Sequence, residues 1–451
     1  MKKLALLLAV CLITWSLAGC QTQPAPSSGE TSASAGSVSS GAQPESSLPE
    51  GDPVVICVNY DFEQDMEELL DYLSAIGVET EYELLVLPSR TEDREAELTR
   101  LRTEIMAGGG PDAFVLGAVL PGTRMDEGKS QEPLFPNVEK SMYSHLFLDL
   151  EDMAQNSDIV DLESCNQVVM DVGVTSQGRF LLPLTYTFSA LLFDRSALND
   201  PDYTFSTLEE LLQSDEEALK GVMAWNTLGL FPDCLGPLAD YEGQNLLVTQ
   251  ESLQAAVEQA DAFAALQDEA YDTRELAYAG LGRSVGWNTL SELQREETAY
   301  AVFPVPDQEG GVIAAVTTYA AINRNTEHPQ EAFALIEQLF REELATQSSL
   351  EVDGYHHCSS FWYGTNSGFF YSLPVKDQLA LDYFAPNLQP DTMASLRAAM
   401  ERMDSAKVYS DFDQTIYQMH DTWHWYYGNP EEPLEGLVER TISSMEMALA
   451  E

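Results

Sequence analysis

Positive charge is scarce in this sequence. Its 451 residues include 22 Lys and Arg against 74 Asp and Glu, which gives a formal net charge of −52. Nucleic-acid binding relies on Lys and Arg to neutralise phosphates, and direct binding to anionic lipid headgroups needs the same charges. The composition therefore excludes nucleic acid as a partner and disfavours a small anionic ligand.

Cysteine is also rare, and its six copies show no metal-binding spacing. No Cys-x-x-Cys occurs, so a structural zinc site is not expected. Cys57, Cys165, Cys234 and Cys358 are too widely spaced to form the disulfide framework of a small secreted domain. They could pair in three ways outside the cytoplasm, but we expect buried free thiols.

Hydrophobic runs of membrane-spanning length are absent. Residues 4–17 are apolar and follow Lys2 and Lys3, which is typical of a secretory signal peptide and shorter than the about 20 residues of a span. The run ends in Leu-Ala-Gly-Cys, which resembles the lipobox of bacterial lipoproteins. This resemblance implies removal of residues 1–19 and a lipid on the sulfur of Cys20. The alternative is an ordinary signal peptide with a chance cysteine.

Residues 21–52 follow with nine serines, repeated Pro, Gly and Ala, and no aromatic residue. Such a segment buries too little apolar surface to offset its ordering entropy. We therefore expect residues 20–52 to be a lipidated cysteine and a disordered linker, with an end-to-end distance of about 30 Å. The folded part would then be held on the outer face of the cytoplasmic membrane by its lipid alone.

The folded part begins with an alternating pattern of strands and helices. Residues 54–59, 80–87 and 113–116 are apolar or alternating and predict strands. Between them, Asp61 and Thr91 are positioned to start two helices that Gly77 and Gly108 end. The apolar face of the first helix would consist of Met66, Leu69, Leu70, Leu73 and Ile76. This β-α-β-α-β order predicts an α/β fold with a parallel sheet and right-handed crossovers.

Ligands of parallel sheets bind beyond the carboxyl ends of the strands. Tyr60 and Asp61 follow the first predicted strand, and Gly117 follows the third. These three residues are therefore candidates for ligand binding.

Several segments of the chain, taken in order, carry motifs of one protein family. One is the helix, glycine turn and Pro-Asp of residues 101–112, and another is Phe-Ser-Thr-Leu-Glu-Glu-Leu at 205–211. The other segments are 182–184, 190–193, 303–306, 314–323 and 328–333. Together they resemble extracellular solute-binding proteins of the maltose-binding type, the substrate-binding lipoproteins of ABC importers. This chain has Phe205 where the family has Trp, and Asp194-Arg195 where the family often has Asn-Lys.

The resemblance implies a two-lobe periplasmic-binding-protein-like fold with the ligand in a cleft between the lobes. Lobe 1 would comprise residues 54–184 and 308–344, and lobe 2 residues 185–307 and 345–451. Hinge closure would capture the ligand. Membrane permease subunits and a separate ATPase would then import it, and we expect the binding protein itself to be a monomer.

Aromatic residues are the candidates for contacting a sugar, because sugars present apolar C–H faces as well as hydroxyl groups. The resemblance places a cleft tryptophan at Trp287. Trp225 lies in an apolar run of the second lobe, Trp362 in an expected loop, and Tyr186 just after the first lobe crossing. We expect these side chains to meet Tyr60 and Asp61 across the ligand.

Three other motifs fit a hydrolase, a phosphate-binding loop and a metal site only poorly. Gly-x-Ser-x-Gly at residues 282–286 would make Ser284 a hydrolase nucleophile, but the preceding residues are a poor strand. Gly-Lys-Ser at 128–130 has the wrong glycine spacing for a phosphate loop. His420 and His424 have metal-ligand spacing without a third ligand, so two half-exposed histidines on a helix are preferred. The aromatic residues at 412, 423 and 426, with Ile416 and Met419, are expected in a core.

We therefore predict a non-enzymatic substrate-binding lipoprotein without metal or cofactor, which captures a small neutral ligand, a sugar or an oligosaccharide. Two alternatives stay open: a secreted hydrolase that uses Ser284, and an adhesion protein with the same fold but no small ligand.

Overall fold

The computed structural model describes residues 52–123, 125–267, 284–362, 368–425 and 432–450. Residues 52–451 form one compact unit. The signal peptide, Cys20 and the linker predicted above fall outside the described residues. In the described part, no helix combines the length and the apolar character that a membrane crossing requires.

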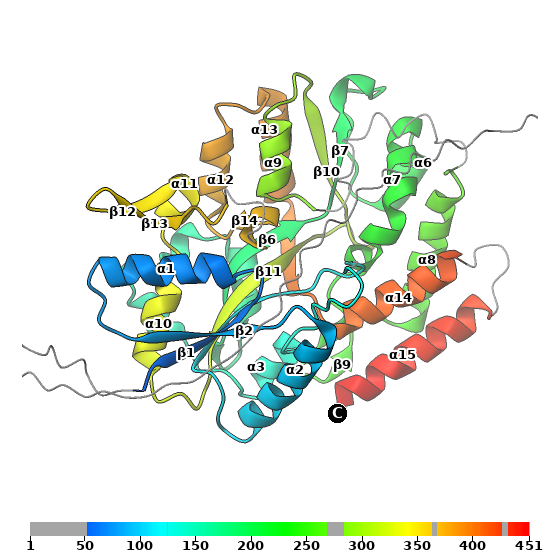
Figure 1. Cartoon of the computed structure of the whole chain (residues 1–451). Coiled ribbons are helices and arrows are strands. Elements are labelled where there is room, and N and C mark those ends of the chain that lie inside the picture. Colours follow the sequence, from blue (N-terminus) through cyan, green and yellow to red (C-terminus); the bar gives the residue numbers. More distant parts are fainter. Residues whose placement is uncertain (1–51, 124, 268–283, 363–367, 426–431, 451) are drawn as a thin grey trace, which may run out of the picture. The chain divides into compact units, whose positions relative to one another are not determined.

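A mixed sheet of seven strands forms the centre of the unit (Figure 1). The strand order is β14-β6-β11-β3-β1-β2, and β15 also pairs with β11. The strands are β1 (Val54–Asn59), β2 (Tyr82–Leu87), β3 (Ala113–Gly117), β6 (Leu182–Phe188), β11 (Val312–Ile322), β14 (Leu373–Pro374) and β15 (Met403–Val408).

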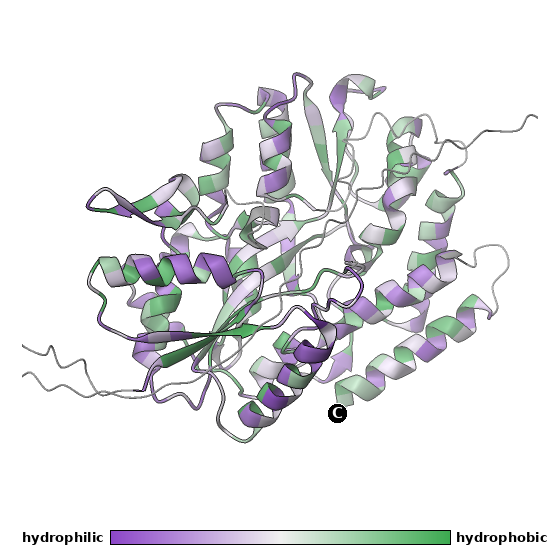
Figure 2. Ribbon diagram, in the orientation of Figure 1, coloured by the Kyte–Doolittle hydropathy of each residue, from purple (hydrophilic) through white to green (hydrophobic). Residues whose placement is uncertain are grey.

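The first half of this sheet is the predicted β-α-β-α-β unit. Strand β1 pairs in parallel with β2 and with β3. The connecting helices are α1 (Glu63–Ala75) and α2 (Thr91–Met106). Because β1 lies between the other two strands, right-handed crossovers put these helices on opposite faces, as Figure 1 shows. Figure 2 shows hydrophilic residues on the outer sides of both helices and hydrophobic residues in the strands between them.

Two local expectations about α1 are wrong. The helix begins after Phe62, which makes no side-chain cap, so Asp61 does not cap it. Ile76 is 44% exposed and lies outside the apolar face, because the helix ends one residue earlier. The predicted glycine stops are confirmed, since Gly77 and Gly108 both have a φ of +89°.

The second half of the sheet departs from the predicted parallel arrangement. Strand β11 runs antiparallel to β3 and β6 and parallel to β15. All residues of β6 and all of β11 except Thr317 are buried. Both strands are therefore covered on two faces, which explains their continuous apolar sequence.

A second layer lies beside the sheet. Strands β7 (Ala190–Asp194) and β10 (Tyr300–Pro304) form an antiparallel ribbon. Two further hydrophobic cores, separate from the core around the large sheet, lie here. Figure 1 shows the helices of this layer grouped together, away from β1 and β2. They include α6 (Leu208–Gln213), α7 (Glu217–Leu230), α8 (Gln250–Ala264), α14 (Asp411–Trp425) and α15 (Leu434–Ala450), with the 3-10 turn η4 (Phe231–Leu235).

The main core extends across the lobe boundaries that the resemblance implied. Buried residues between positions 345 and 408, which the prediction gave to lobe 2, share this core with β1, β3 and α1. His356 and His357 lie in a hairpin strand of this region. The elements of these segments are α9 (Trp287–Leu293), α10 (Pro329–Gln338), α12 (Asp377–Phe384), α13 (Pro390–Glu401), β12 (Ser349–Val352) and β13 (Tyr355–Ser359).

The remaining short elements connect these layers. They are α3 (Val138–Tyr143), α4 (Glu151–Gln155), α5 (Gln167–Met170), α11 (Glu343–Thr346), β4 (Val174–Thr175), β5 (Gly178–Arg179), β8 (Ala239–Asp240), β9 (Asn245–Leu246), and the 3-10 turns η1 (Leu162–Ser164), η2 (Asp171–Gly173), η3 (Arg195–Ala197) and η6 (Gly368–Tyr371).

Candidate functional site

Three strands of the sheet end close together. Along β11, Ala314 pairs with Phe188 at the end of β6, Val316 with Val408 at the end of β15, and Thr318 with Gly117 at the end of β3. The chain that leaves each of these strands therefore starts within a few residues of the same point on β11.

A cavity of about 120 Å³ lies where these chain segments meet the helical layer, and we call it the junction cavity. Hydroxyl groups dominate its polar lining, and neither Lys nor Arg lines it. Its walls consist of Leu120, Pro121 and Thr123 after β3, Thr187 and Ser189 at the end of β6, Gly229, Pro232 and Asp233 from α7 and η4, and Ser284 and Tyr409.

Asp233 is the charged residue of this wall, and it is buried. Its Oδ2 accepts a hydrogen bond of 2.6 Å from the Ser189 hydroxyl, and its Oδ1 accepts one of 2.7 Å from the Tyr409 hydroxyl. A carboxylate has about four lone-pair sites, so two can still accept hydrogen bonds from a ligand.

A buried lysine lies behind the wall. The Nζ of Lys407 is 2.7 Å from Oδ1 of Asp413 and 3.9 Å from Oδ1 of Asp233. It also donates to the carbonyl oxygen of Pro232 at 3.1 Å. Lys407 thus balances part of the negative charge without facing the cavity as a free cation.

The pKa values here reflect burial first. Burial raises the pKa of Asp233, while Lys407, Ser189 and Tyr409 lower it by favouring the ionised form. Burial lowers the pKa of Lys407, but Asp413 and Asp233 oppose this effect, and the resulting pKa is raised. The pKa of Tyr409 lies well above its ordinary value because the ring is buried beside Asp233, so its hydroxyl stays protonated and donates.

Three of the predicted site residues lie together at the carboxyl ends of β1 and β3. The Tyr60 hydroxyl accepts a 3.3 Å hydrogen bond from Gln131, and a β-carbon on Gly117 would lie 3.2 Å from Nδ2 of Asn59. Oδ1 of Asp61 is buried and has no hydrogen-bond partner among the described residues. Burial raises the pKa of Asp61, and the nearby Arg94 lowers it. None of these three lines the junction cavity.

The aromatic candidates behave differently from the prediction. Tyr186, Trp287 and Trp362 are at most 3% exposed and belong to the main core. The Trp287 ring lies 6.1 Å from that of Trp362 and 4.8 Å from that of Phe384, measured between centroids. Trp287 and Trp362 thus pack among other rings, and Tyr186 is buried in the same core, so none of the three side chains is exposed in a cleft in this structure. Trp225 on α7 is 36% exposed, but it does not line the junction cavity.

Sequence reasoning missed Thr187, Ser189, Asp233 and Tyr409. Ser189 had a usable signal, because it is a polar residue directly before the apolar segment 190–193 that carries part of the resemblance. Asp233 had a weaker signal, as a lone carboxylate in the otherwise apolar stretch from Leu228 to Cys234.

The other motifs have simpler explanations. Ser284 lines the junction cavity, but no histidine does, and residues 282 and 283 of its motif lie outside the described part. His420 is buried, contrary to the expected half-exposed position, and its ring stacks on Phe231 at 3.9 Å. Among the described residues, no group of His, Cys, Asp or Glu is arranged to hold a metal ion. Cys57, Cys165, Cys234 and Cys358 are buried free thiols, as predicted.

The helical spacing in α14 predicted its core face correctly. Phe412, Ile416 and Met419 are buried, and Trp423 packs partly buried against the same core. Tyr426 lies outside the described residues.

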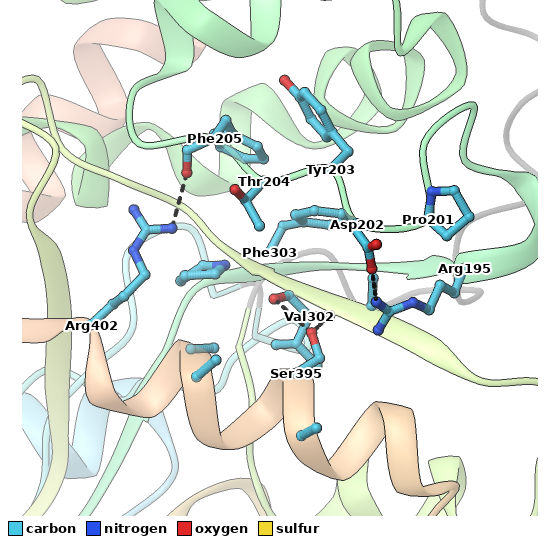
Figure 3. A pocket seen from close by; sticks show the side chains of 15 residues that line it. Arg195, Pro201, Asp202, Tyr203, Thr204, Phe205, Val302, Phe303, Ser395 and Arg402 are labelled. Atoms are coloured by element: carbon cyan, nitrogen blue, oxygen red, sulfur yellow. Dashed lines mark hydrogen bonds and ion pairs between the residues drawn. The ribbon is translucent and has the colours of Figure 1, made fainter.

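A larger cavity of about 290 Å³ shares no residue with the junction cavity (Figure 3). It lies between the loop after β7, strand β10 and α13, with Arg195 and Arg402 on opposite sides of Phe303. Arg195 pairs with Asp202 at 3.3 Å, and Arg402 donates to the carbonyl oxygen of Phe205 at 3.0 Å. These polar groups already have partners within the protein.

The fold is that of extracellular solute-binding proteins, as solved structures show. The sugar-binding protein MalE from Xanthomonas citri superposes with a TM-score of 0.54 at 15% identity, covering 88% of this chain and 98% of that one. A periplasmic oligogalacturonide binding protein from Yersinia enterocolitica gives 0.50 at 14% identity, covering 88% and 99%.

A de novo designed cysteine esterase gives a TM-score of 0.54 at 14% identity, with 88% and 98% covered. Neither a family model nor a curated protein sequence matches this chain. At such low sequence identity, the superpositions show only that the chain shares its fold with these proteins. The fold alone does not assign a ligand.

Proposed function

We propose that this chain is the substrate-binding lipoprotein of an ABC importer and captures a small neutral solute, a sugar or an oligosaccharide. The observation that carries the proposal is the junction cavity, where hydroxyl groups and one buried carboxylate meet at the ends of three strands. Such a lining suits a ligand that donates and accepts several hydrogen bonds.

The charge of the lining narrows the ligand class. Asp233 supplies the one carboxyl group of the lining, and no Lys or Arg lines the cavity, so nothing there would compensate an anionic group on the ligand. A neutral polyhydroxylated ligand meets the site without an unpaired buried charge.

The size of the cavity supports hinge motion. Small-molecule sites usually measure about 300–1,000 Å³, more than the about 120 Å³ found here. A sugar would therefore enter only when the walls from the sheet and from the helical layer move apart, and closure would follow binding. Tyr60, Asp61 and Gly117 would join the site at the sheet side in that open form.

The cellular role belongs to the same proposal. A lipid on Cys20 and the linker up to residue 52 would hold the domain at the outer face of the cytoplasmic membrane. Permease subunits and a separate ATPase would supply the pore and the energy, since the binding fold itself moves only by closure. We propose a monomer as the binding unit.

The test is calorimetric titration and thermal unfolding of the full chain with neutral mono- and oligosaccharides, and with polyamines and peptides as other ligand classes. We expect one saccharide to raise the unfolding temperature and to compact the protein in small-angle scattering. Stabilisation by polyamines or peptides alone would contradict the sugar assignment.

Ser284 lines the cavity, so the hydrolase alternative needs its own arm of the experiment. Ester and glycoside substrates should give no turnover. Turnover that is present in the wild type and lost in Ser284→Ala would overturn the binding-protein proposal.

A further inference from the structure

In the part of the chain that the structure describes, three segments lead directly from a strand of the large sheet to the ribbon or the helical layer, or back, and we call them the crossings. The first is Ser189, between β6 and β7. The second is residues 305–311, between β10 and β11, and the third is residues 409–410, between β15 and α14. Any motion of one layer against the other must bend these segments.

The short turn η4 bonds to all three crossings. Asp233 accepts hydrogen bonds from Ser189 of the first crossing and from Tyr409 of the third. The carbonyl oxygen of Cys234 accepts a 3.1 Å hydrogen bond from the backbone N–H of Gln308, in the second crossing. Five consecutive residues therefore contact all three crossings.

The crossings also bond to each other and to the charges behind η4. The N–H of Val305 donates to the carbonyl oxygen of Ser189 at 2.9 Å, which ties the second crossing to the first. Asp413, which pairs with Lys407, accepts hydrogen bonds from the N–H and the hydroxyl of Ser410 at 2.9 and 3.0 Å. The third crossing is thus held from both sides.

A buried network of this kind could serve folding stability alone. Its position argues for more, because Ser189, Pro232, Asp233 and Tyr409 are at the same time part of the junction-cavity wall. A ligand that hydrogen-bonds this wall touches the groups that fix the crossings. The Asp233 carboxylate is therefore placed both to contact a ligand and to hold the crossings.

We propose that Asp233 is a positioning residue that clamps the three crossings together and tightens this clamp when a hydroxylic ligand occupies the junction cavity. The inference rests on the proposed function for its ligand, but the clamp itself exists without ligand. The two claims can therefore be tested separately.

The first test is hydrogen exchange of the ligand-free full chain. In Asp233→Asn, the amide has one oxygen, so Ser189 and Tyr409 lose one of their two carboxylate acceptors. We expect the amides of Val305 and Gln308 in the second crossing to exchange at least tenfold faster, although neither bonds to the Asp233 side chain. Amides of β1 should exchange at the wild-type rate.

Milder variants keep the test decisive if Asp233→Asn folds poorly. Ser189→Ala and Tyr409→Phe each remove one hydroxyl and should each accelerate exchange at Gln308. The matched control is Ser360→Ala, which removes another buried serine hydroxyl, bonded to the carbonyl of Leu344 at 2.7 Å, far along the chain from the crossings. It should leave exchange at Val305 and Gln308 unchanged. Unchanged exchange at both amides in Ser189→Ala and Tyr409→Phe would overturn the clamp.

The second test adds maltose as the probe and measures binding by calorimetry on the same samples. If maltose binds, wild-type exchange at Val305 and Gln308 should slow at least threefold, and Asp233→Asn should lose this slowing. Binding without any slowing would overturn the coupling while leaving the proposed function intact. If neither maltose nor any other saccharide binds, the proposed function fails, and the ligand-free arm still decides the clamp.

Discussion

At the scale of the residue, His420 is the buried group with the clearest pH signature. Its ring stacks on Phe231, and burial, with His424 nearby, lowers its pKa from 6.5 to about 3. Below pH 6.5 the imidazole therefore binds a proton in the unfolded chain but stays neutral in the folded chain. The contribution of this residue to stability is complete above pH 6.5 and is lost as the pH falls toward 3. The buried imidazole thus makes the helical layer acid-sensitive.

We predict that His420→Leu is less sensitive to acid than the wild type. The test measures the free energy of unfolding in urea for both proteins at pH 7 and at pH 4.5. Between these pH values, the wild type should lose on the order of 2 kcal/mol more of this free energy than the variant. The same difference at both pH values would show that the histidine is not a source of acid sensitivity.

Glu139 on α3 has the opposite dependence. Burial raises its pKa to about 7, Asp413 adds to the effect, and a backbone hydrogen bond from Val408 and the charge of Lys407 oppose it. Between pH 4.5 and 7 the folded chain keeps a proton that the unfolded chain has released, so stability falls as the pH rises through this window.

Glu139→Gln mimics the protonated form and should remove this loss. We expect the variant to be more stable than wild type at pH 8, by on the order of 1 kcal/mol because the group is partly exposed, and nearly equal to it at pH 4.5. Urea midpoints at the two pH values test this. A variant that is less stable at pH 8 would mean that the ionised carboxylate is needed beside Lys407.

At the scale of the element, the loop after β3 rests directly on α14. Gly122 has a φ of +75°, and a β-carbon there would overlap the ring of Tyr417. The N–H of Gly122 also donates to Gln414 at 3.4 Å. This loop supplies Leu120, Pro121 and Thr123 to the wall of the junction cavity, and its close approach to α14 requires glycine at position 122.

Gly122→Ala should therefore destabilise the chain by about 1–3 kcal/mol, through overlap and backbone strain together. Thermal unfolding of the single variant, of Tyr417→Ser and of the double variant measures the coupling. Removing the ring should make the added methyl group less costly, with the cost of the positive φ remaining. Strict additivity of the two substitutions would show that the loop and the helix do not touch in solution.

Elements with strong local signals could be predicted from the sequence. The strand at residues 54–59 and the glycine stops at Gly77 and Gly108 needed only apolar runs and turn chemistry. The mixed pairing of β11 could not be predicted, because an apolar run buried on both faces carries no information on the direction of its neighbours. The α/β class and the solute-binding fold followed from the order of motifs, each of which is weak alone.

The site was harder to predict for a related reason. Trp287 and Trp362 have the composition of a sugar platform, yet the same apolar rings are equally suited to a core, and burial depends on distant segments such as α12. Ser189 and Asp233 are separated by 44 residues and meet only because the turn η4 packs against the end of β6 in the folded chain. Long-range contacts of single polar residues leave no periodic pattern in a sequence.

At the scale of the whole molecule, the excess of acidic residues gives the chain a large net negative charge. The formal charge is −52, and removal of the predicted signal peptide with Lys2 and Lys3 would make it 20 − 74 = −54. Exposed ion pairs such as Arg100 with Glu104 involve few of the 74 acidic side chains. Most carboxylates therefore repel one another across the surface of the folded chain, and they are farther apart once it unfolds.

Salt should then stabilise this protein instead of weakening it. The Debye length falls from about 30 Å at 0.01 M to about 10 Å at 0.1 M, so added NaCl screens repulsion over the whole surface while pairs in contact, such as Lys407 with Asp413, are screened far less. We expect the urea midpoint at pH 7.5 to rise steadily between 10 and about 300 mM NaCl. At pH 4.5, where many exposed carboxylates approach neutrality, the same salt step should have a smaller effect. A midpoint that falls with salt at pH 7.5 would mean that attractive pairs outweigh the net charge, and the acidic surface would then need another role than a repulsive shell.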